Sequence, residues 1–165
     1  MEQDIRFRKI RKEEFDCLKK LFPGDGELWK KYRAKCVGLL ANHEMDTFVI
    51  ETSTGVIGEL TVNYTSHELQ SETLPGRRVY LSAYRLERAH RGNGLGQKLL
   101  DYVLTDMQAR GYTEFTIGVE EDNEIAKHIY FKYGFVVPID YGDGDEFDPS
   151  KYTLYLKAAK DRKTE

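Results

Sequence analysis

Hydrophobic periodicity changes abruptly in the middle of the chain, across three closely spaced glycines. The segment RVYLSAYRLE, residues 78–87, is rich in tyrosine and aliphatic residues and predicts a β-strand. After Gly92, Gly94 and Gly96, apolar residues recur at the spacing of a helix up to Gly111. Glycines let the backbone approach a ligand closely, and the N-terminus of a helix favours an anion. Together with the positive charge of Arg91, this turn predicts a pyrophosphate site.

The remaining segments predict a mixed sheet with helices on its faces. The element order is βααβββαβαββ, which indicates an α/β (α+β) fold with right-handed strand–helix–strand units in its second half. A length of 165 residues is that of one domain, so we expect a single domain over residues 1–165. The expected strands are 4–10, 47–53, 56–65, 78–87, 113–119, 135–141 and 151–157, and the expected helices are 13–22, 25–42, 95–111 and 123–134.

Charge and composition argue against several functional classes. The chain has 25 Lys and Arg against 28 Asp and Glu, a net charge of −3. A protein that binds nucleic acid by neutralising phosphates normally has an excess of basic residues. No apolar run approaches the roughly 18 residues of a membrane span, and the start MEQDIRFRKI lacks an apolar h-region. We therefore expect no nucleic-acid or membrane partner and a cytoplasmic location. Cys17 and Cys36 fit a reducing compartment, and the four histidines show no metal-ligand spacing, so we predict no metal site.

Two common phosphate motifs do not match the glycine-rich turn. A P-loop needs Gly-Lys-Ser/Thr, but Gly96 is followed by Gln97-Lys98-Leu99. A dinucleotide fingerprint needs a different glycine spacing. From these residues alone, a tight turn with only a structural role stays an alternative to the pyrophosphate site.

The turn resembles the acyl-CoA motif of the GNAT superfamily of N-acetyltransferases. That motif is Gln/Arg-x-x-Gly-x-Gly/Ala between a strand and a helix, and Arg91-Gly-Asn-Gly94-Leu-Gly96 matches every fixed position. Downstream, the segment from Asn123 through Tyr130 to Gly134-Phe135 is similar to the family's Asn-x-x-Ala…Tyr…Gly-Phe pattern. The resemblance, strong over about 79–135, implies a GNAT-like domain with a mostly antiparallel sheet of about seven strands. It also implies an acceptor side formed by about 12–45, 59–77 and 138–150.

The resemblance further implies a set of residues that bind acetyl-CoA. The strand before the turn would bind the pantetheine arm through its backbone, the turn would hold the pyrophosphate, Asn123 would bond the pantetheine or thioester, and Lys132 could meet a CoA phosphate. Family members often carry an aliphatic residue at the Tyr84 position and a proline at the Arg88 position, so this chain departs from the pattern there. The full set is Tyr84, Leu86, Arg88, Arg91, Gly92, Asn93, Gly94, Leu95, Gly96, Asn123 and Lys132.

Acetyl transfer to an amine needs a general acid and a general base. Tyr130 matches the family's tyrosine that protonates the departing thiolate, and a phenol with a pKa of about 10 keeps its proton at neutral pH. A packing tyrosine is the alternative. Alternation places Tyr80, Ser82, Tyr84 and Leu86 on the cofactor face of the strand and Glu87 on the other side. That face carries no carboxylate, so Glu59 on the preceding strand is the candidate base by sheet adjacency.

The implied activity is direct transfer of acetyl from acetyl-CoA to the primary amine of a small molecule in a ternary complex. Two alternatives stay open: a non-catalytic acyl-CoA-binding sensor, and an acetyltransferase for protein or peptide N-terminal amines. A homodimer, which many family members form, also stays open. An acidic run could attract a cationic acceptor or form a solvated loop; it consists of Asp140, Asp143, Asp145, Glu146 and Asp148.

Overall fold

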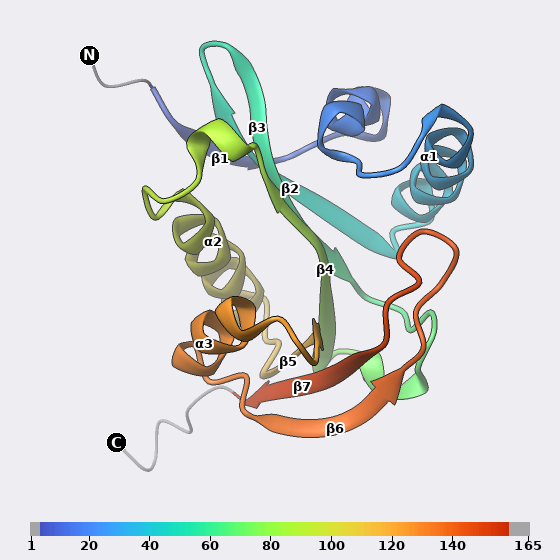
Figure 1. Ribbon diagram of the computed structural model, residues 1–165, viewed down its shortest axis with the longest axis vertical. Coiled ribbons are helices and arrows are strands. Elements are labelled where there is room, and N and C mark those ends of the chain that lie inside the picture. Colours follow the sequence, from blue (N-terminus) through green and yellow to red (C-terminus); the bar gives the residue numbers. More distant parts are fainter. Residues whose placement is uncertain (1–3, 159–165) are drawn as a thin grey trace. The chain divides into compact units, whose positions relative to one another are not determined.

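The computed structural model of the chain describes residues 4–158, so residues 1–3 and 159–165 of the expected domain lie outside the described part. Figure 1 labels the strands and helices. The strands are β1 (Arg6–Lys9), β2 (Met45–Thr52), β3 (Gly55–Asn63), β4 (Arg78–Leu86), β5 (Glu114–Glu120), β6 (Val137–Gly142) and β7 (Tyr152–Ala158). The α-helices are α1 (Gly26–Ala41), α2 (Leu95–Ala109) and α3 (Glu124–Lys132), and the 3-10 helices are η1 (Lys12–Leu21), η2 (Gln70–Glu72) and η3 (Arg88–His90).

The strands form one mixed sheet in the order β1-β2-β3-β4-β5-β7-β6. The β1–β2, β5–β7 and β6–β7 pairs are antiparallel, whereas β4 and β5 are parallel. The predicted fold class and element order are confirmed, with η1 as the first helix. It is a 3-10 helix, and it buries Phe15 and Leu18.

By its internal contacts the chain divides into two compact units. The first comprises the described residues 4–62 and 82–106, and the second comprises 63–81 and 107–158. Both β4 and α2 contribute to each unit.

Helical elements cover both faces of the sheet in the first unit. On one face, the Tyr102 ring of α2 stacks on Phe7 of β1 at 5.6 Å and meets Phe48 of β2 edge-on at 6.0 Å. On the other face, Arg8 of β1 pairs with Glu14 of η1 at 2.8 Å. Phe7 and Arg8 are neighbours in a strand, so their side chains point to opposite faces.

An aromatic cluster joins η1 to α1 in the first unit. Phe15 stacks on Trp29 at 5.6 Å between ring centroids, and Phe22 stacks on Tyr32 at 4.8 Å. Asp25 caps α1 as predicted, because its Oδ1 accepts the Leu28 N–H at 2.9 Å. This cap and the aromatic rings fix the start of α1 against η1.

The second unit is built around the strands β5, β7 and β6 and the first half of β4. Its core side chains are fully buried, namely Val79, Leu81, Met107, Phe115, Phe135 and Leu154. The predicted surface loop 66–77 contains η2 and winds around the buried carboxylate of Glu72. That carboxylate accepts the His67 N–H at 2.7 Å and the Leu69 N–H at 3.2 Å. Because these bonds lie within the loop, Glu72 organises its shape.

Candidate active site

The glycine-rich turn runs into α2 with two residues in the left-handed conformation. Gly92 has φ 87° and Gly94 has φ 77°, and a Cβ at either would meet nothing within 4 Å. Glycine is therefore needed here for its backbone conformation rather than for space. The first amides of α2, beginning at Leu95, lack acceptors within the helix and carry its positive dipole end. This arrangement suits the pyrophosphate of a nucleotide-containing ligand.

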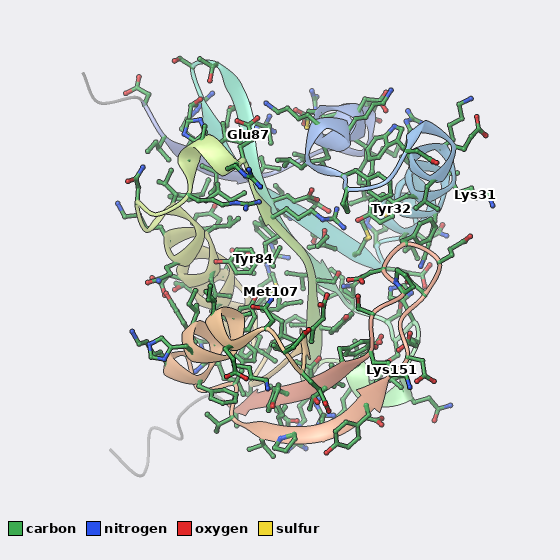
Figure 2. All side chains as sticks on the ribbon, viewed as in Figure 1. Lys31, Tyr32, Tyr84, Glu87, Met107 and Lys151 are labelled. Carbon is green, nitrogen blue, oxygen red and sulfur yellow. The ribbon has the colours of Figure 1, made fainter. Side chains whose placement is uncertain are left out.

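Two side-chain bonds connect β4 to the turn and to the start of α2. Arg91 donates from Nε to the Leu86 carbonyl at 3.0 Å, and the Tyr84 hydroxyl donates to the Gly96 carbonyl. Figure 2 shows Tyr84 between β4 and α2. Arg88 lies in sequence between Leu86 and Arg91 and begins η3. Its carbonyl accepts the Arg91 N–H at 3.2 Å. The structure thus brings together the predicted residues Tyr84, Leu86, Arg88 and Arg91 with the turn itself; Gly92, Asn93 and Gly94 are exposed there, and Leu95 is buried.

The backbone of β4 changes direction within the strand. Its parallel register with β5 runs from Arg78 to Leu81, and Ala83, two residues later, has φ 50°. A left-handed residue other than glycine is uncommon, and it interrupts the alternation of side chains. Counting every second residue across Ala83 therefore does not define one face. The interpretation that put Tyr80, Ser82, Tyr84 and Leu86 on a common cofactor face depended on unbroken alternation.

Beyond Ala83, the side chains of β4 face two different sets of neighbours. Tyr84 bonds to α2, whereas Arg85 lies against Glu59 of β3 and the aromatic rings of the η1–α1 cluster. Sequence reasoning missed Arg85. Nothing in the sequence SAYRL indicates that Ala83 has a left-handed backbone conformation. No local signal therefore showed that Arg85 is the neighbour of Glu59.

Glu59 forms a buried ion pair with Arg85. The Glu59 side chain is only 1% exposed, and its Oε2 lies 3.6 Å from Arg85 Nη1. Neither of these two buried atoms has a hydrogen-bond partner within residues 4–158. Burial raises the pKa of Glu59 to about 7, against the opposing effect of Arg85. An unpartnered buried polar atom costs about 1–3 kcal/mol, so the fold keeps this pair at a cost to stability.

Two aromatic rings hold the Arg85 guanidinium. Its Cζ lies 5.7 Å from the ring centroids of both Phe22 and Tyr32. Figure 2 shows Tyr32 on the inner side of α1. Burial, with the nearby Cys36 and Glu59, raises the pKa of the Tyr32 hydroxyl, so this side chain stays neutral. The rings attract the cation and restrict its movement.

The second motif lies on α3 in the other unit. Asn123 is the N-cap of α3, and its Oδ1 accepts the Ala126 N–H at 3.1 Å. Tyr130 is half-buried and meets Phe135 edge-on at 6.2 Å between ring centroids. Burial raises the pKa of Tyr130 to about 12, so the phenol holds its proton over the whole physiological range. Lys132 is exposed in the last turn of α3.

Carboxylates of the acidic run 140–148 accept hydrogen bonds from within the run and from Ser71. Asp140 accepts the Ser71 hydroxyl at 2.6 Å, which lowers the pKa of that carboxyl. Asp145 accepts the backbone N–H groups of Phe147 and Asp148 at 2.9 Å. These bonds give the carboxylates a role in shaping the loop.

Residues 4–158 lack two further features, a metal-binding cluster and a membrane-spanning helix. No group of three or more His, Cys, Asp and Glu side chains is placed there to hold a metal ion. In the same range, no helix combines the length and apolar character needed to cross a membrane.

Comparison with known proteins places the chain in a family. The model of the acetyltransferase (GNAT) family matches residues 7–135. A curated relative, GCN5-related N-acetyltransferase 6, chloroplastic, from Arabidopsis thaliana is 22% identical in an alignment of 166 positions that covers 89% of this chain and 54% of the relative. The chain thus spans about half the length of the curated relative that it matches.

Solved structures share the fold at low sequence identity. Ard1 from Thermoplasma volcanium superposes with a TM-score of 0.72 at 15% identity, covering 95% of this chain and 99% of that one. The protein yncA from Salmonella typhimurium, solved with its cofactor acetyl-CoA, gives a TM-score of 0.68 at 16% identity, and the match covers 96% of both chains. With the family match over residues 7–135, the chain belongs to the GNAT family of acetyltransferases.

Proposed function

We propose that this protein transfers an acetyl group from acetyl-CoA to the primary amine of a small molecule, with both substrates bound together. The observation that carries the proposal is the pair of left-handed glycines, Gly92 and Gly94, at the start of α2. A left-handed backbone and a helix N-terminus suit a pyrophosphate, and the family match supplies the acyl-CoA context.

Acetyl-CoA would be held mainly by backbone groups. In this proposal the amides of residues 92–96 bind the pyrophosphate, because the Arg91 N–H already donates to the Arg88 carbonyl, and the backbone of Tyr84 and Leu86 faces the pantetheine arm. Lys132 meets a CoA phosphate. Because the Asn123 side-chain oxygen already caps α3, its side-chain amide N–H is the group left for the pantetheine or thioester.

Two side chains would move the protons. The amine nitrogen attacks the thioester carbonyl carbon, the C–S bond breaks, Glu59 takes the proton of the amine, and Tyr130 gives its proton to the departing thiolate. A pKa of about 7 leaves Glu59 able to accept a proton at neutral pH, and a pKa of about 12 keeps Tyr130 protonated until the thiolate forms. At neutral pH Glu59 can therefore accept a proton in the first step, and Tyr130 can donate one in the second.

Calorimetric titration with acetyl-CoA followed by a screen of amines tests the proposal. We expect acetyl-CoA to bind and thiol release to depend on an amine. Tyr130→Phe should lower kcat by about 100-fold, the scale of a lost general acid, with an unchanged Kd for acetyl-CoA. Tyr102→Phe is the matched control, because Tyr102 is 40% exposed on α2 and lies outside the implied acceptor and cofactor residues; it should alter neither quantity.

Three results would contradict the proposal in different ways. Failure to bind acetyl-CoA removes its basis. Binding without turnover on any amine indicates the acyl-CoA sensor instead. Turnover restricted to peptide N-termini indicates the protein-modifying acetyltransferase.

A further inference from the structure

Carboxylates hold three arginines of this chain, Arg8, Arg78 and Arg85, in two different ways. Arg8 donates to Glu14 at 2.8 Å, and Arg78 donates to Glu114 at 2.6 Å. Both are direct, charge-assisted hydrogen bonds. The Arg85 pair is looser, since 3.6 Å separates its Nη1 from Glu59 Oε2 and neither atom has a hydrogen-bond partner in the described part of the chain. Arg85 therefore keeps hydrogen-bonding capacity that the other two use within the fold.

The surroundings of Arg85 fix its position without using its donors. The rings of Phe22 and Tyr32, each 5.7 Å from Cζ, offer no carboxylate or carbonyl acceptor in these contacts. The side chain is 23% exposed, so part of it reaches the surface while Nη1 is buried. A planar guanidinium that is held in this way is preorganised for a planar anion, because carboxylate oxygens match its forked donors.

Arg85 also lies beside the groups assigned to the reaction in the same unit. Its neighbour in β4, Tyr84, bonds to the first turn of α2, and the turn at Arg91 follows six residues later. On its other side is Glu59, the proposed base. An anion on Arg85 would therefore bring its own molecule next to Glu59.

We propose that Arg85 binds a carboxylate of the acceptor, so that the acceptor is a small amine that carries a carboxyl group, as an α-amino acid does. This inference rests on the proposed function and adds the chemical class of its acceptor. An amino acid has an ammonium and a carboxylate on one carbon, and Arg85 and Glu59 present the opposite charges side by side. The match sets the orientation of the acceptor, with its nitrogen toward the base.

The same charges disfavour two other classes of acceptor, polyamines and peptide N-termini. A polyamine would place a second cation near Arg85 without an anion to pair with it. A peptide N-terminus has a neutral amide where a free amino acid has its carboxylate, so it would leave Arg85 unpaired. Specificity of this kind comes from a polar group that only one acceptor can satisfy.

The test compares acceptors that differ only in the carboxyl group. Each of a panel of α-amino acids is assayed beside its amide and its decarboxylated amine, with acetyl-CoA saturating. We expect the free acid to exceed the amide in kcat/KM by tenfold or more. Arg85→Gln should abolish this preference, chiefly by raising KM for the acid, and Arg85→Lys should restore part of it.

Arg6→Gln is the matched control for loss of an arginine in the same unit, because Arg6 lies outside the implied acceptor side. Arg6 is on β1 and donates to Glu51 at 2.8 Å. This variant should keep the preference for the acid. The Kd for acetyl-CoA, measured on every variant, shows that each one is folded and that the cofactor site is intact.

A binding measurement covers the case in which turnover is too slow to compare. The protein saturated with CoA is titrated with N-acetyl amino acids and with the matching N-acetyl amides. Selective binding of the acids that is lost in Arg85→Gln supports the inference. Three outcomes would overturn the inference: equal binding of acids and amides, no binding of the acids, or an unchanged preference for the acids in Arg85→Gln. If the protein still binds acetyl-CoA in these cases, the proposed function itself is not contradicted. A chain that does not bind acetyl-CoA fails at the proposed function itself.

Discussion

At the residue scale, the buried pair of Glu59 and Arg85 shows how sheet adjacency creates chemistry that no single segment contains. Glu59 comes from β3 and Arg85 from β4, and the rings around Arg85 come from the end of η1 and from α1. Burial and the positive charge act on Glu59 in opposite directions, and burial is the larger effect. The carboxyl is therefore held near the midpoint of its titration at neutral pH.

The raised pKa of Glu59 predicts a pH-dependent stability. A carboxyl that rises from 4.5 to about 7 on folding binds its proton more tightly in the folded state. The contribution of the protonated Glu59 to the free energy of unfolding is fully present below pH 4.5. It is lost as the pH rises through 7, and the total loss is about 3 kcal/mol. We expect Glu59→Gln to match the wild type in free energy of unfolding at pH 4.5 and to exceed it at pH 8. Denaturant unfolding at the two pH values measures this, and a constant difference between the two proteins would contradict it.

At the element scale, the turn between β4 and α2 depends on backbone conformation and on two anchoring bonds. Gly92 and Gly94 supply left-handed residues, while Arg91 and Tyr84 tie the turn to β4 and to α2. Since the side chains of Gly92 to Gly94 would have open space around them, substitutions here act through the backbone.

Replacement of Gly94 should damage ligand binding more than stability. A β-branched valine at φ 77° costs about 1–2 kcal/mol, or relaxes by moving the amides that follow. We expect Gly94→Val to weaken acetyl-CoA binding by at least tenfold in calorimetry while the protein stays folded. Gly38→Ala on α1 is the control, because a Cβ there also meets nothing within 4 Å and the position has no positive φ. It should leave binding unchanged and add about 0.5–1 kcal/mol of stability. Equal binding by the wild type and Gly94→Val would exclude the turn as the cofactor site.

At the scale of the whole molecule, a few ion pairs connect elements that are distant in sequence. Arg8 of β1 bonds to Glu51 of the adjacent strand β2 and to Glu14 of η1, so one guanidinium holds the edge of the sheet and the helix above it. Its bonds lower the pKa of both carboxyls. This network has the pH dependence opposite to that of Glu59.

Loss of the Glu14 carboxylate should destabilise the protein only above the acid range. The hydrogen bond from Arg8, followed by that from the Arg11 backbone, lowers the pKa of Glu14 from 4.5 to about 2. The resulting stability is present above pH 4.5 and is lost as the pH falls through 2. We expect Glu14→Gln to lower the free energy of unfolding by about 1–2 kcal/mol at pH 7, allowing for the 23% exposure of the side chain. The deficit should close near pH 2, and a deficit that persists there in denaturant unfolding would contradict an electrostatic origin.

Much of the fold followed from local patterns. Hydrophobic period predicted the strands and helices in their order, and Asp25 marked the start of α1, because caps and amphipathic faces depend on nearby residues. The glycine-rich turn was also predictable, since a left-handed backbone and a helix N-terminus are local properties. The 3-10 form of η1 was not predictable in this way, because the three-residue spacing of Phe15 and Leu18 fits an α-helix as well.

The surroundings of the candidate base were decided by tertiary structure. Sequence placed Glu59 on a strand next to β4 but gave neither its burial nor its partner. Ala83 takes a left-handed conformation that its residue type does not signal, and Arg85 beyond it lies against Glu59 rather than toward α2. Likewise, the acidic residues 140–148 were a charge run in the sequence, and the fold turned Asp140 toward Ser71. The sequence determined the elements and the glycine turn because those depend on neighbours along the chain, whereas charge, burial and partners at the site depend on contacts between strands and helices far apart in it.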